Sequence, residues 1–482
     1  MRDDVTAKNL ERSRTGFKDS AGTWYAPDNA GSIMPAVSDP VSTSLFRVSA
    51  VLDGDIDQDL MQAALERVTR RFPYFHVELR KGLFWYYFVP CRGRPRLVPD
   101  SPSPCQDYDI NRRGTCLFRV RVTGPRVACE FSHALSDGTG CVRFLKNLVV
   151  EYLRLRSLAA AAPVGGTVLA DAAAAPSTAS TGTVLAAPGL ASPPSAPADA
   201  ADPDLCDLDG PVPPEEYEDA YSRYFTKDYP APDHLTRAFH LGSAQLPRHQ
   251  YRATYGILPL DAALALAKKR GLSLTELLAA AYLDAFQSVW MSAPEEKRRR
   301  QRPRLAVEIP VNMRKFYPTA TNRNFSLFVL VTQDMRLGPR SFDEIAERVH
   351  HELRYETDPR NIARQIRRNV GGAWHPLVRV TPLVVKTFLA KAVFSALGDD
   401  LVTGFVSNLG AISLPPGYAA QVRRFDAIPT PSAFNKTNAA VLSYQDKLYV
   451  SFGSLAESRE IERFFYTRLR SLGLPVHVEC SL

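Results

Sequence analysis

A low-complexity segment interrupts the chain and limits what its 482 residues can fold into. Between residues 159 and 198, alanine, proline, serine, threonine and glycine dominate, Asp171 is the only charged residue, and no aromatic residue occurs. Such a stretch cannot bury enough apolar surface to offset the entropy that it would lose on ordering. We therefore interpret it as part of a linker between two folded units, because a chain of this length is expected to need more than one core.

The two flanking parts have the composition of globular enzymes. Hydrophobic residues make up 45% of the chain and charged residues 23%, which is ordinary for a folded protein. We predict an N-terminal lobe over residues 1–157, a linker and crossover over 158–234, and a C-terminal lobe over 235–482.

Helix and strand signals alternate in both lobes. In the first, an apolar stripe at helical spacing predicts a helix over residues 58–71, which Pro73 ends. Strand-like runs follow at residues 75–80, 83–89, 116–122 and 126–132. In the second, the capping box Ser273-Leu274-Thr275-Glu276 predicts the start of a helix. Further helices are predicted at 342–354 and 460–472, and strands at 304–311, 325–331, 401–407, 439–444 and 448–453. The alternation favours an α/β architecture in which each lobe is a mixed β-sheet flanked by helices.

The run FSHALSDG, residues 131–138, contains the pattern H-x-x-x-D-G. Alternating apolar residues precede it and apolar residues at helical spacing follow it, so His133 lies where a strand ends and a turn begins. A side chain in that place can face a cleft, and the pKa of an imidazole lies near working pH, which makes His133 the best candidate for a catalytic base. The pattern alone equally supports a structural turn in which Asp137 caps the helix and Gly138 permits the tight bend.

This segment resembles the active-site motif of the chloramphenicol-acetyltransferase-like superfamily, which includes condensation domains, the plant-type BAHD acyltransferases and the alcohol acetyltransferases. Other regions are similar to motifs that follow the same order in that superfamily: Arg71-Phe72-Pro73, residues 310–314 with 321–325, and residues 406–410. The resemblance implies a fold of two such lobes with an active-site channel between them.

Two departures place the resemblance closest to the alcohol acetyltransferase-like branch. Condensation domains usually carry a second histidine directly before the catalytic one, and here that position is Ser132. The plant-type branch carries a late D-F-G-W-G motif, which Arg424-Phe425-Asp426-Ala427 does not match.

The resemblance assigns roles to the motif residues. It implies that His133 is the general base, which takes the proton of the acceptor as that atom attacks an acyl thioester. Asp137 is expected to turn away from the substrate and to pair with an arginine, for which Arg314 is one candidate, while Gly138 allows close approach of the loop.

An acyl transfer also needs a group that stabilises the oxyanion. Ser407 and Asn408 are candidates because they lie at a predicted strand end, where a simple strand-ending turn is an equally supported interpretation. Asn435 is a weaker candidate of the same kind.

The implied function is transfer of an acetyl or other acyl group from a coenzyme A thioester to an alcohol. Acyl-CoA, with acetyl-CoA as the first candidate, would be a co-substrate, and no permanently bound cofactor is expected. An acyl-carrier-protein-dependent or amine-directed acyltransferase stays open, as does a catalytically silent binding member of the same fold. The acceptor would be a small-molecule alcohol or amine, and one monomer is expected to hold the whole site.

Other features restrict the partners and the compartment. The seven cysteines form no C-x-x-C pair, and the histidines show no metal-ligand spacing, so we expect free thiols, no metal and a cytoplasmic protein. The net charge of +8 comes from scattered residues, so no nucleic acid partner is expected.

Two segments carry alternatives. Residues 295–304, EEKRRRQRPR, are interpreted as a solvated loop, with contact to CoA phosphates or to an acidic carrier protein as the alternative. The apolar segment 376–397 is interpreted as a core or cleft-lining helix, and the alternative is a surface for a fatty substrate or a peripheral membrane contact.

Overall fold

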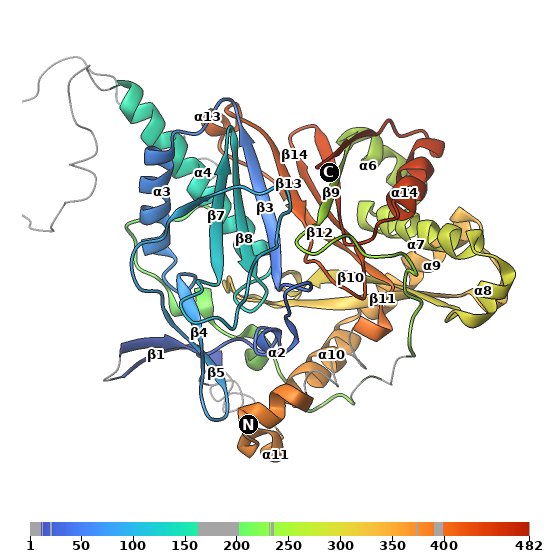
Figure 1. Ribbon diagram of the computed structural model, residues 1–482, viewed down its shortest axis with the longest axis horizontal. Helices are drawn as coiled ribbons and strands as arrows, with labels where there is room; N and C mark the ends of the chain where they lie inside the picture. Colours follow the sequence, from blue (N-terminus) through green and yellow to red (C-terminus); the bar gives the residue numbers. More distant parts are fainter. Residues whose placement is uncertain are drawn as a thin grey trace, which may run out of the picture.

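The computed structural model describes residues 11, 13–19, 22–161, 202–230, 232, 236–372, 375–389 and 399–481. Most of the low-complexity segment, from residue 162 to 198, lies outside these residues. The described chain forms two lobes that each combine a β-sheet with covering helices, which confirms the predicted α/β architecture (Figure 1).

Five strands form the main sheet of the N-terminal lobe, in the order β13-β3-β8-β7-β6. Their bounds are β3 (Leu45–Leu52), β6 (Leu97–Pro99), β7 (Phe118–Thr123), β8 (Arg126–Ser132) and β13 (Val422–Ile428). β6 runs parallel to β7, and the other pairs are antiparallel. β13 comes from the C-terminal half of the chain and pairs with β3, so this sheet contains both halves of the sequence.

Two long helices, α3 (Gln58–Arg71) and α4 (Gly138–Ala161), pack against this sheet. α3 has the bounds that the apolar stripe predicts, and Asp57 caps its first turn by accepting a hydrogen bond from the backbone of Leu60. Aromatic rings fill the space between helix and sheet: the rings of Phe131 in β8 and Phe144 in α4 lie 5.5 Å apart. Full burial of a side chain of this size stabilises the fold by about 1.5–3 kcal/mol, so this cluster holds α4 against the strand that ends at His133.

A smaller sheet has the strand order β1-β2-β5-β4. Its strands are β1 (Gly16–Asp19), β2 (Gly22–Tyr25), β4 (Val77–Lys81) and β5 (Tyr86–Pro90). β4 and β5 form the hairpin that Lys81-Gly82 predicts, and they confirm the two strand-like runs that precede and follow this turn.

Seven strands form the sheet of the C-terminal lobe, in the order β11-β10-β12-β14-β15-β9-β16. They are β9 (Arg252–Pro259), β10 (Arg304–Asn312), β11 (Ser326–Asp334), β12 (Gly404–Ile412), β14 (Thr437–Tyr444), β15 (Lys447–Ser454) and β16 (His477–Cys480). The sheet is mixed, because β10, β12 and β14 run parallel and the other pairs are antiparallel.

Helices cover this sheet on the right of Figure 1, where α7 packs against β10 and β12 and contacts its neighbouring helices. They are α6 (Leu260–Lys269), α7 (Leu274–Ser292), α9 (Phe342–Glu356) and α14 (Glu460–Ser471). The predicted capping box is present, since Ser273 and Glu276 each accept a hydrogen bond from the other's backbone. A further helix is α10 (Pro359–Gly371). Shorter elements are α2 (Met34–Val37), η1 (Pro214–Tyr217), α5 (Ala220–Arg223), η2 (Met313–Lys315), η3 (Met335–Leu337), η4 (Asp399–Leu401) and α13 (Pro416–Ala419).

The crossover segment 202–230 is fastened to the N-terminal lobe by a buried ion pair. Arg71 at the end of α3 donates two hydrogen bonds of 2.7 Å to Glu216, and the Tyr74 hydroxyl donates a third of 2.9 Å. Asn322 of the C-terminal half donates to the oxygen of Tyr74 at 2.7 Å. This network therefore links both halves of the chain next to the Arg71-Phe72-Pro73 segment.

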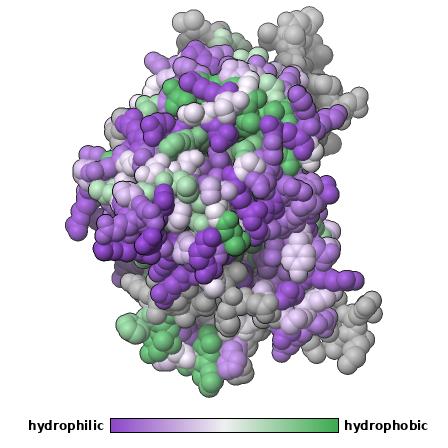
Figure 2. Space-filling model, turned by 90° about the vertical axis from the view of Figure 1, so that its right-hand side faces the viewer, coloured by the Kyte–Doolittle hydropathy of each residue, from purple (hydrophilic) through white to green (hydrophobic). Residues whose placement is uncertain are grey.

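Two predictions about local structure are wrong. Residues 295–300 are not a loop but the short exposed helix α8 (Glu295–Arg300), in which Arg299 and Glu295 pair at helical spacing. The core helix predicted over residues 376–397 is also wrong for its described part, α11 (Pro376–Val380) and the helical residues 383–389. Leu377, Val384 and Phe388 are 69%, 83% and 76% exposed. Apolar side chains gather at the lower end of the face in Figure 2, at the height where Figure 1 shows α11.

Within the described residues, no helix has the length and apolar character required to cross a membrane.

Candidate active site

The backbone around His133 is held from both sides. The amide of His133 donates to the carbonyl of Ser44 at 2.8 Å, which extends the pairing of β3 and β8 by one residue. Its carbonyl accepts a hydrogen bond of 2.9 Å from the side chain of Asn324. The imidazole is half-buried and lies 4.4 Å from the ring of Phe46, centroid to centroid. The strand end, the Asn324 clamp and the Phe46 ring together fix where the imidazole stands.

The surroundings of His133 favour its neutral form. Burial lowers the pKa of His133 below its ordinary value, while the Asp137 carboxylate and the Asn324 side chain oppose this shift. A neutral imidazole has a nitrogen lone pair and can accept a proton, which is what a general base requires.

Asp137 is occupied by donors on both carboxylate oxygens. Oδ2 accepts hydrogen bonds from Arg314 Nη1 at 2.8 Å and from the Phe325 amide at 2.9 Å. Oδ1 accepts from the amides of Thr139 at 3.1 Å and Gly140 at 3.3 Å in the first turn of α4. The carboxylate therefore caps α4 and binds the Arg314 loop, so it is placed to position the motif rather than to transfer protons.

Arg314 organises the loop that lies against the motif. Besides Asp137, its guanidinium donates to the carbonyls of Thr321 at 2.9 Å and Arg323 at 2.5 Å. The loop is thus closed on itself and on the strand-to-helix turn, which brings the 310–314 and 321–325 segments to the H-x-x-x-D-G run.

Two glycines allow the neighbouring segments to approach the motif. A Cβ on Gly138 would lie 2.3 Å from Cδ2 of Leu409 in β12, a side-chain atom. A Cβ on Gly140 would lie 2.3 Å from the backbone oxygen of Asn322 and 2.2 Å from Oγ of Ser136. Gly140 is the more restrictive position, because a backbone atom cannot rotate away, and it lies outside the H-x-x-x-D-G run.

Of the oxyanion candidates, Ser407 lies in β12 two residues before Leu409, whose side chain lies next to Gly138 of the motif. The pairing of β12 with β14 becomes irregular after Asn408, between these two residues. The Ser407 side chain is partly exposed, and its hydroxyl makes no hydrogen bond to the described part of the chain.

Asn408 is engaged in local structure instead. Its Nδ2 donates to Oγ1 of Thr275 in α7 at 2.9 Å, and its Oδ1 accepts from the amide of Gly410 at 2.9 Å. These bonds shape the irregularity that interrupts the pairing of β12 with β14 after Asn408.

The structure does not join Asn435 to His133. β14 places Ala440 beside Ser407, whereas Asn435 precedes the start of that strand. Its amide donates to Ser432 at 3.1 Å and its carbonyl accepts from Asn438 at 2.7 Å. Among the described residues, no hydrogen bond connects Asn435 with the motif.

A buried carboxyl next to the site was missed by the sequence analysis. Asp28 accepts hydrogen bonds from the amide of Gly31 at 2.7 Å and from Nδ2 of Asn324 at 2.9 Å. Burial raises the pKa of Asp28 to about 7, and the charge of Asp219 adds to this shift. Asp28 therefore orients Asn324, which holds the carbonyl of His133. Residue 28 lies outside every motif, and only the packing reveals its role.

Comparison with known proteins identifies the fold. No protein-family model matches the sequence, and no curated protein is significantly similar to it. Solved structures do match over nearly their whole length. Trichothecene 15-O-acetyltransferase from Fusarium sporotrichioides is 8% identical with a TM-score of 0.56, covering 96% of this chain and 97% of the other. F. graminearum TRI101 complexed with coenzyme A and deoxynivalenol is 11% identical with a TM-score of 0.53, covering 92% and 96%. Polyketide synthase associated protein 5 from Mycobacterium tuberculosis is 13% identical with a TM-score of 0.51, covering 92% and 97%.

These likenesses confirm the two-lobed fold predicted from the motifs. The chain shares the fold of these three solved structures, and its own H-x-x-x-D-G run lies where β8 meets α4.

Proposed function

We propose that this protein is an acyltransferase that moves an acyl group from a coenzyme A thioester to an alcohol hydroxyl, with His133 as general base. The observation that carries the proposal is the fixed, neutral imidazole of His133 on a turn that Asp137 and Arg314 hold in place, within an acyltransferase fold.

The reaction needs only one proton acceptor and no covalent enzyme intermediate. A ring nitrogen of His133 takes the hydroxyl proton as the acceptor oxygen bonds to the thioester carbonyl carbon. The tetrahedral intermediate then expels the thiolate, which receives the proton from the imidazolium. General-base help of this kind contributes about 10²–10⁴-fold.

Ser407 is the proposed donor to the oxyanion. Its hydroxyl has no hydrogen-bond partner among the described residues, and Ser407 lies two residues before Leu409, whose side chain lies next to Gly138 of the motif. A donor that is already in place costs no reorganisation when charge develops on the carbonyl oxygen. Asn408 is less suited, since Thr275 and Gly410 already engage its amide.

We base the proposed acyl donor and acceptor of this protein on the ligands of the solved structures. One matching structure holds coenzyme A and a small-molecule toxin, which favours acyl-CoA as donor and a small-molecule alcohol as acceptor. Transfer from an acyl-carrier protein or to an amine are the alternatives, and acetyl-CoA is the first donor to test. We propose that a single cytoplasmic monomer carries the whole site in a channel between the lobes.

The experiment is a thiol-release assay with acetyl-CoA and a panel of alcohols and amines. Wild-type protein should release free CoA in the presence of an acceptor, and His133→Ala should lose roughly 10²–10⁴-fold of that rate. His351→Ala is the matched control, because that imidazole is 71% exposed on α9. A wild-type rate at background, with acyl-carrier protein also inactive as donor, would identify a silent binding member of the fold.

We also propose that the exposed apolar surface formed by residues 83–85 and 377–389 contacts the surface of a lipid membrane. The two segments are joined: the amide of Leu383 donates to the carbonyl of Leu83 at 2.8 Å, and Lys386 Nζ lies 3.3 Å from the ring centroid of Trp85. The preceding helix α10 contains four arginines and no acidic residue. Apolar side chains beside such a cationic helix suit an anionic leaflet.

A further inference from the structure

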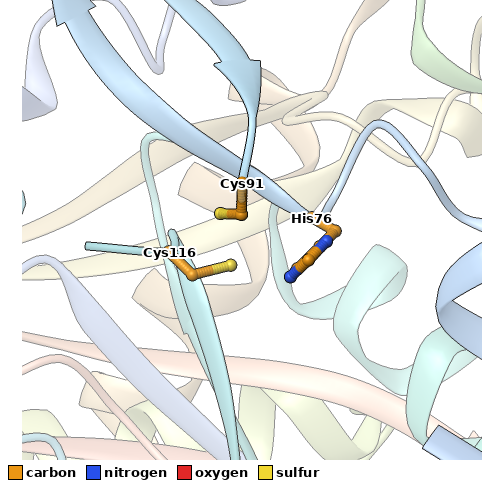
Figure 3. Close-up of side chains that lie close together, drawn as sticks. All are labelled: His76, Cys91 and Cys116. Carbon is orange, nitrogen blue, oxygen red and sulfur yellow. The ribbon is translucent and has the colours of Figure 1, made fainter. Parts of the chain in front are cut away.

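Three metal-ligating side chains meet in the N-terminal lobe, outside the acyl-transfer site. The ligand atoms of His76, Cys91 and Cys116 all lie within 4.8 Å of one another. Figure 3 shows the two sulfur atoms and the imidazole gathered around one space. In the described part of the chain, this is the only group of His, Cys, Asp and Glu side chains with such spacing.

Backbone pairing sets the positions of the three residues. The amide of Cys91 donates to the carbonyl of His76 at 2.9 Å, where the β4–β5 hairpin begins and ends. Cys116 forms a bridge with Glu78 of β4, and the amide of Leu117 donates to the carbonyl of Val77 at 2.9 Å. The three ligands therefore come from neighbouring extended segments that main-chain hydrogen bonds hold together.

Their chemistry suits zinc. Zn²⁺ is bound tetrahedrally by thiolate and imidazole, with Zn–S of about 2.3 Å and Zn–N of about 2.0–2.1 Å. Such a site places its ligand atoms about 3.5–3.8 Å apart. A pair of ligand atoms at the 4.8 Å limit therefore needs to close by about 1 Å, which rotation of side chains supplies. All three residues are partly exposed, which leaves a path for the ion.

Metal ligands bind as thiolate and neutral imidazole, so binding of Zn²⁺ displaces the thiol protons of Cys91 and Cys116.

A fourth ligand position opens into a pocket of about 600 Å³ that the same three residues line. Six arginines and one acidic residue, Glu78, also line it; the arginines are Arg80, Arg92, Arg94, Arg96, Arg113 and Arg119. Zn²⁺ with two thiolates carries no net charge, so the arginines do not repel the occupied site. Their cationic field favours a small anion over neutral ligands at the open position.

We propose that His76, Cys91 and Cys116 form a zinc site whose fourth position, open to the arginine-lined pocket, binds water or a small inorganic anion. Sites with three protein ligands and one open position are the arrangement that zinc enzymes use for catalysis. This site is independent of the proposed acyl transfer. Among the described residues, no hydrogen bond joins His76, Cys91 or Cys116 to His133 or Asp137.

The test is metal analysis of the full chain purified with a reductant. We expect about one zinc per chain, and Co²⁺ titration should give the visible absorption of a tetrahedral site with a sulfur-to-cobalt charge-transfer band. Addition of inorganic phosphate should shift the Co²⁺ spectrum if an anion enters the fourth position, and an unchanged spectrum would overturn that part of the proposal.

Variants locate the ligands. Cys91→Ser, Cys116→Ser and His76→Gln should each lose the charge-transfer band or most of the bound zinc, whereas Cys480→Ser, an exposed cysteine, should keep both. Circular dichroism checks that the variants fold. Reduced wild-type protein that binds neither Zn²⁺ nor Co²⁺ overturns the proposal without any variant.

Discussion

Arg314 donates a hydrogen bond of 2.8 Å to Asp137, a residue 177 positions earlier in the chain. Both side chains are largely buried, 12% and 9% exposed. The pair fastens a loop of the C-terminal half to the turn that carries His133. The two halves of the chain therefore depend on each other for the geometry of the proposed base.

Removal of one member of this pair should destabilise the fold. Asp137→Asn leaves Arg314 buried without a counter-charge, so we expect the free energy of unfolding to fall by about 3–5 kcal/mol. The comparison is Asp53→Asn, which breaks the exposed pair of Asp53 with Arg423 and should cost about 0–1 kcal/mol. Urea denaturation measures both, and similar small losses in the two variants would contradict a structural role for Asp137.

The pH dependence of the reaction should report the environment of His133. Because burial lowers its pKa, the imidazole stays neutral to lower pH than a free histidine. We expect kcat/KM to fall with decreasing pH through a midpoint below about 6.5. The free energy of unfolding should also fall with decreasing pH. The lowered pKa of His133 contributes stability at pH values above the pKa of the unfolded state, and this stability is lost as the pH falls through the pKa of the folded state. A midpoint above that of free histidine would show that the Asp137 charge outweighs burial.

Much of the fold follows from local sequence signals. The stripe over residues 58–71 and the capping box at Ser273 gave helices with the observed starts, because both signals depend on neighbouring residues. The pairing of β13 with β3 could not be predicted this way. Its partners lie more than 350 residues apart, and no local pattern records which strand completes a sheet.

Some residues of the candidate site could likewise be predicted from local sequence, and others could not. Ordered motifs pointed to His133, Asp137 and the Arg314 loop, which the structure brings together. Asp28 carries no motif, and its importance appears only once packing removes water from its carboxyl. Residues 377–389 were predicted to be buried but are largely exposed, because apolar composition alone does not distinguish a core helix from an uncovered one.

Asp28 should make stability depend on pH. Its pKa in the folded protein is about 7, raised from 3.8, so its carboxyl contributes stability at low pH that is lost as pH rises toward 7. Asn at residue 28 stays neutral at every pH. Relative to the Asp28→Asn variant, the free energy of unfolding of the wild type should therefore fall by up to roughly 4 kcal/mol between pH 4 and 8. Urea denaturation across this range measures the difference, and a difference that does not vary with pH would contradict the raised pKa.

The two motif glycines should differ in their tolerance of a methyl group. Gly140→Ala meets the backbone of Asn322 and should lower the melting temperature by several degrees, as expected for a core clash of about 1–3 kcal/mol. Gly138→Ala meets only the side chain of Leu409, so a second change, Leu409→Ala, should relieve it. Thermal unfolding of the single and double variants checks this. Failure of Leu409→Ala to relieve Gly138→Ala would contradict the steric explanation for glycine at residue 138.

The exposed apolar surface of residues 83–85 and 377–389 should bind anionic lipid. Vesicles of phosphatidylglycerol and phosphatidylcholine should sediment the wild type, and binding should weaken with salt because cations steer the protein to the leaflet. Val384→Asp and Phe388→Asp place charges on side chains that are 83% and 76% exposed, so they should reduce binding without unfolding the protein. Leu337→Asp is the control, since Leu337 is 74% exposed on η3, outside this surface. Sedimentation of Val384→Asp and Phe388→Asp equal to that of Leu337→Asp, or no sedimentation of the wild type, would contradict the membrane contact.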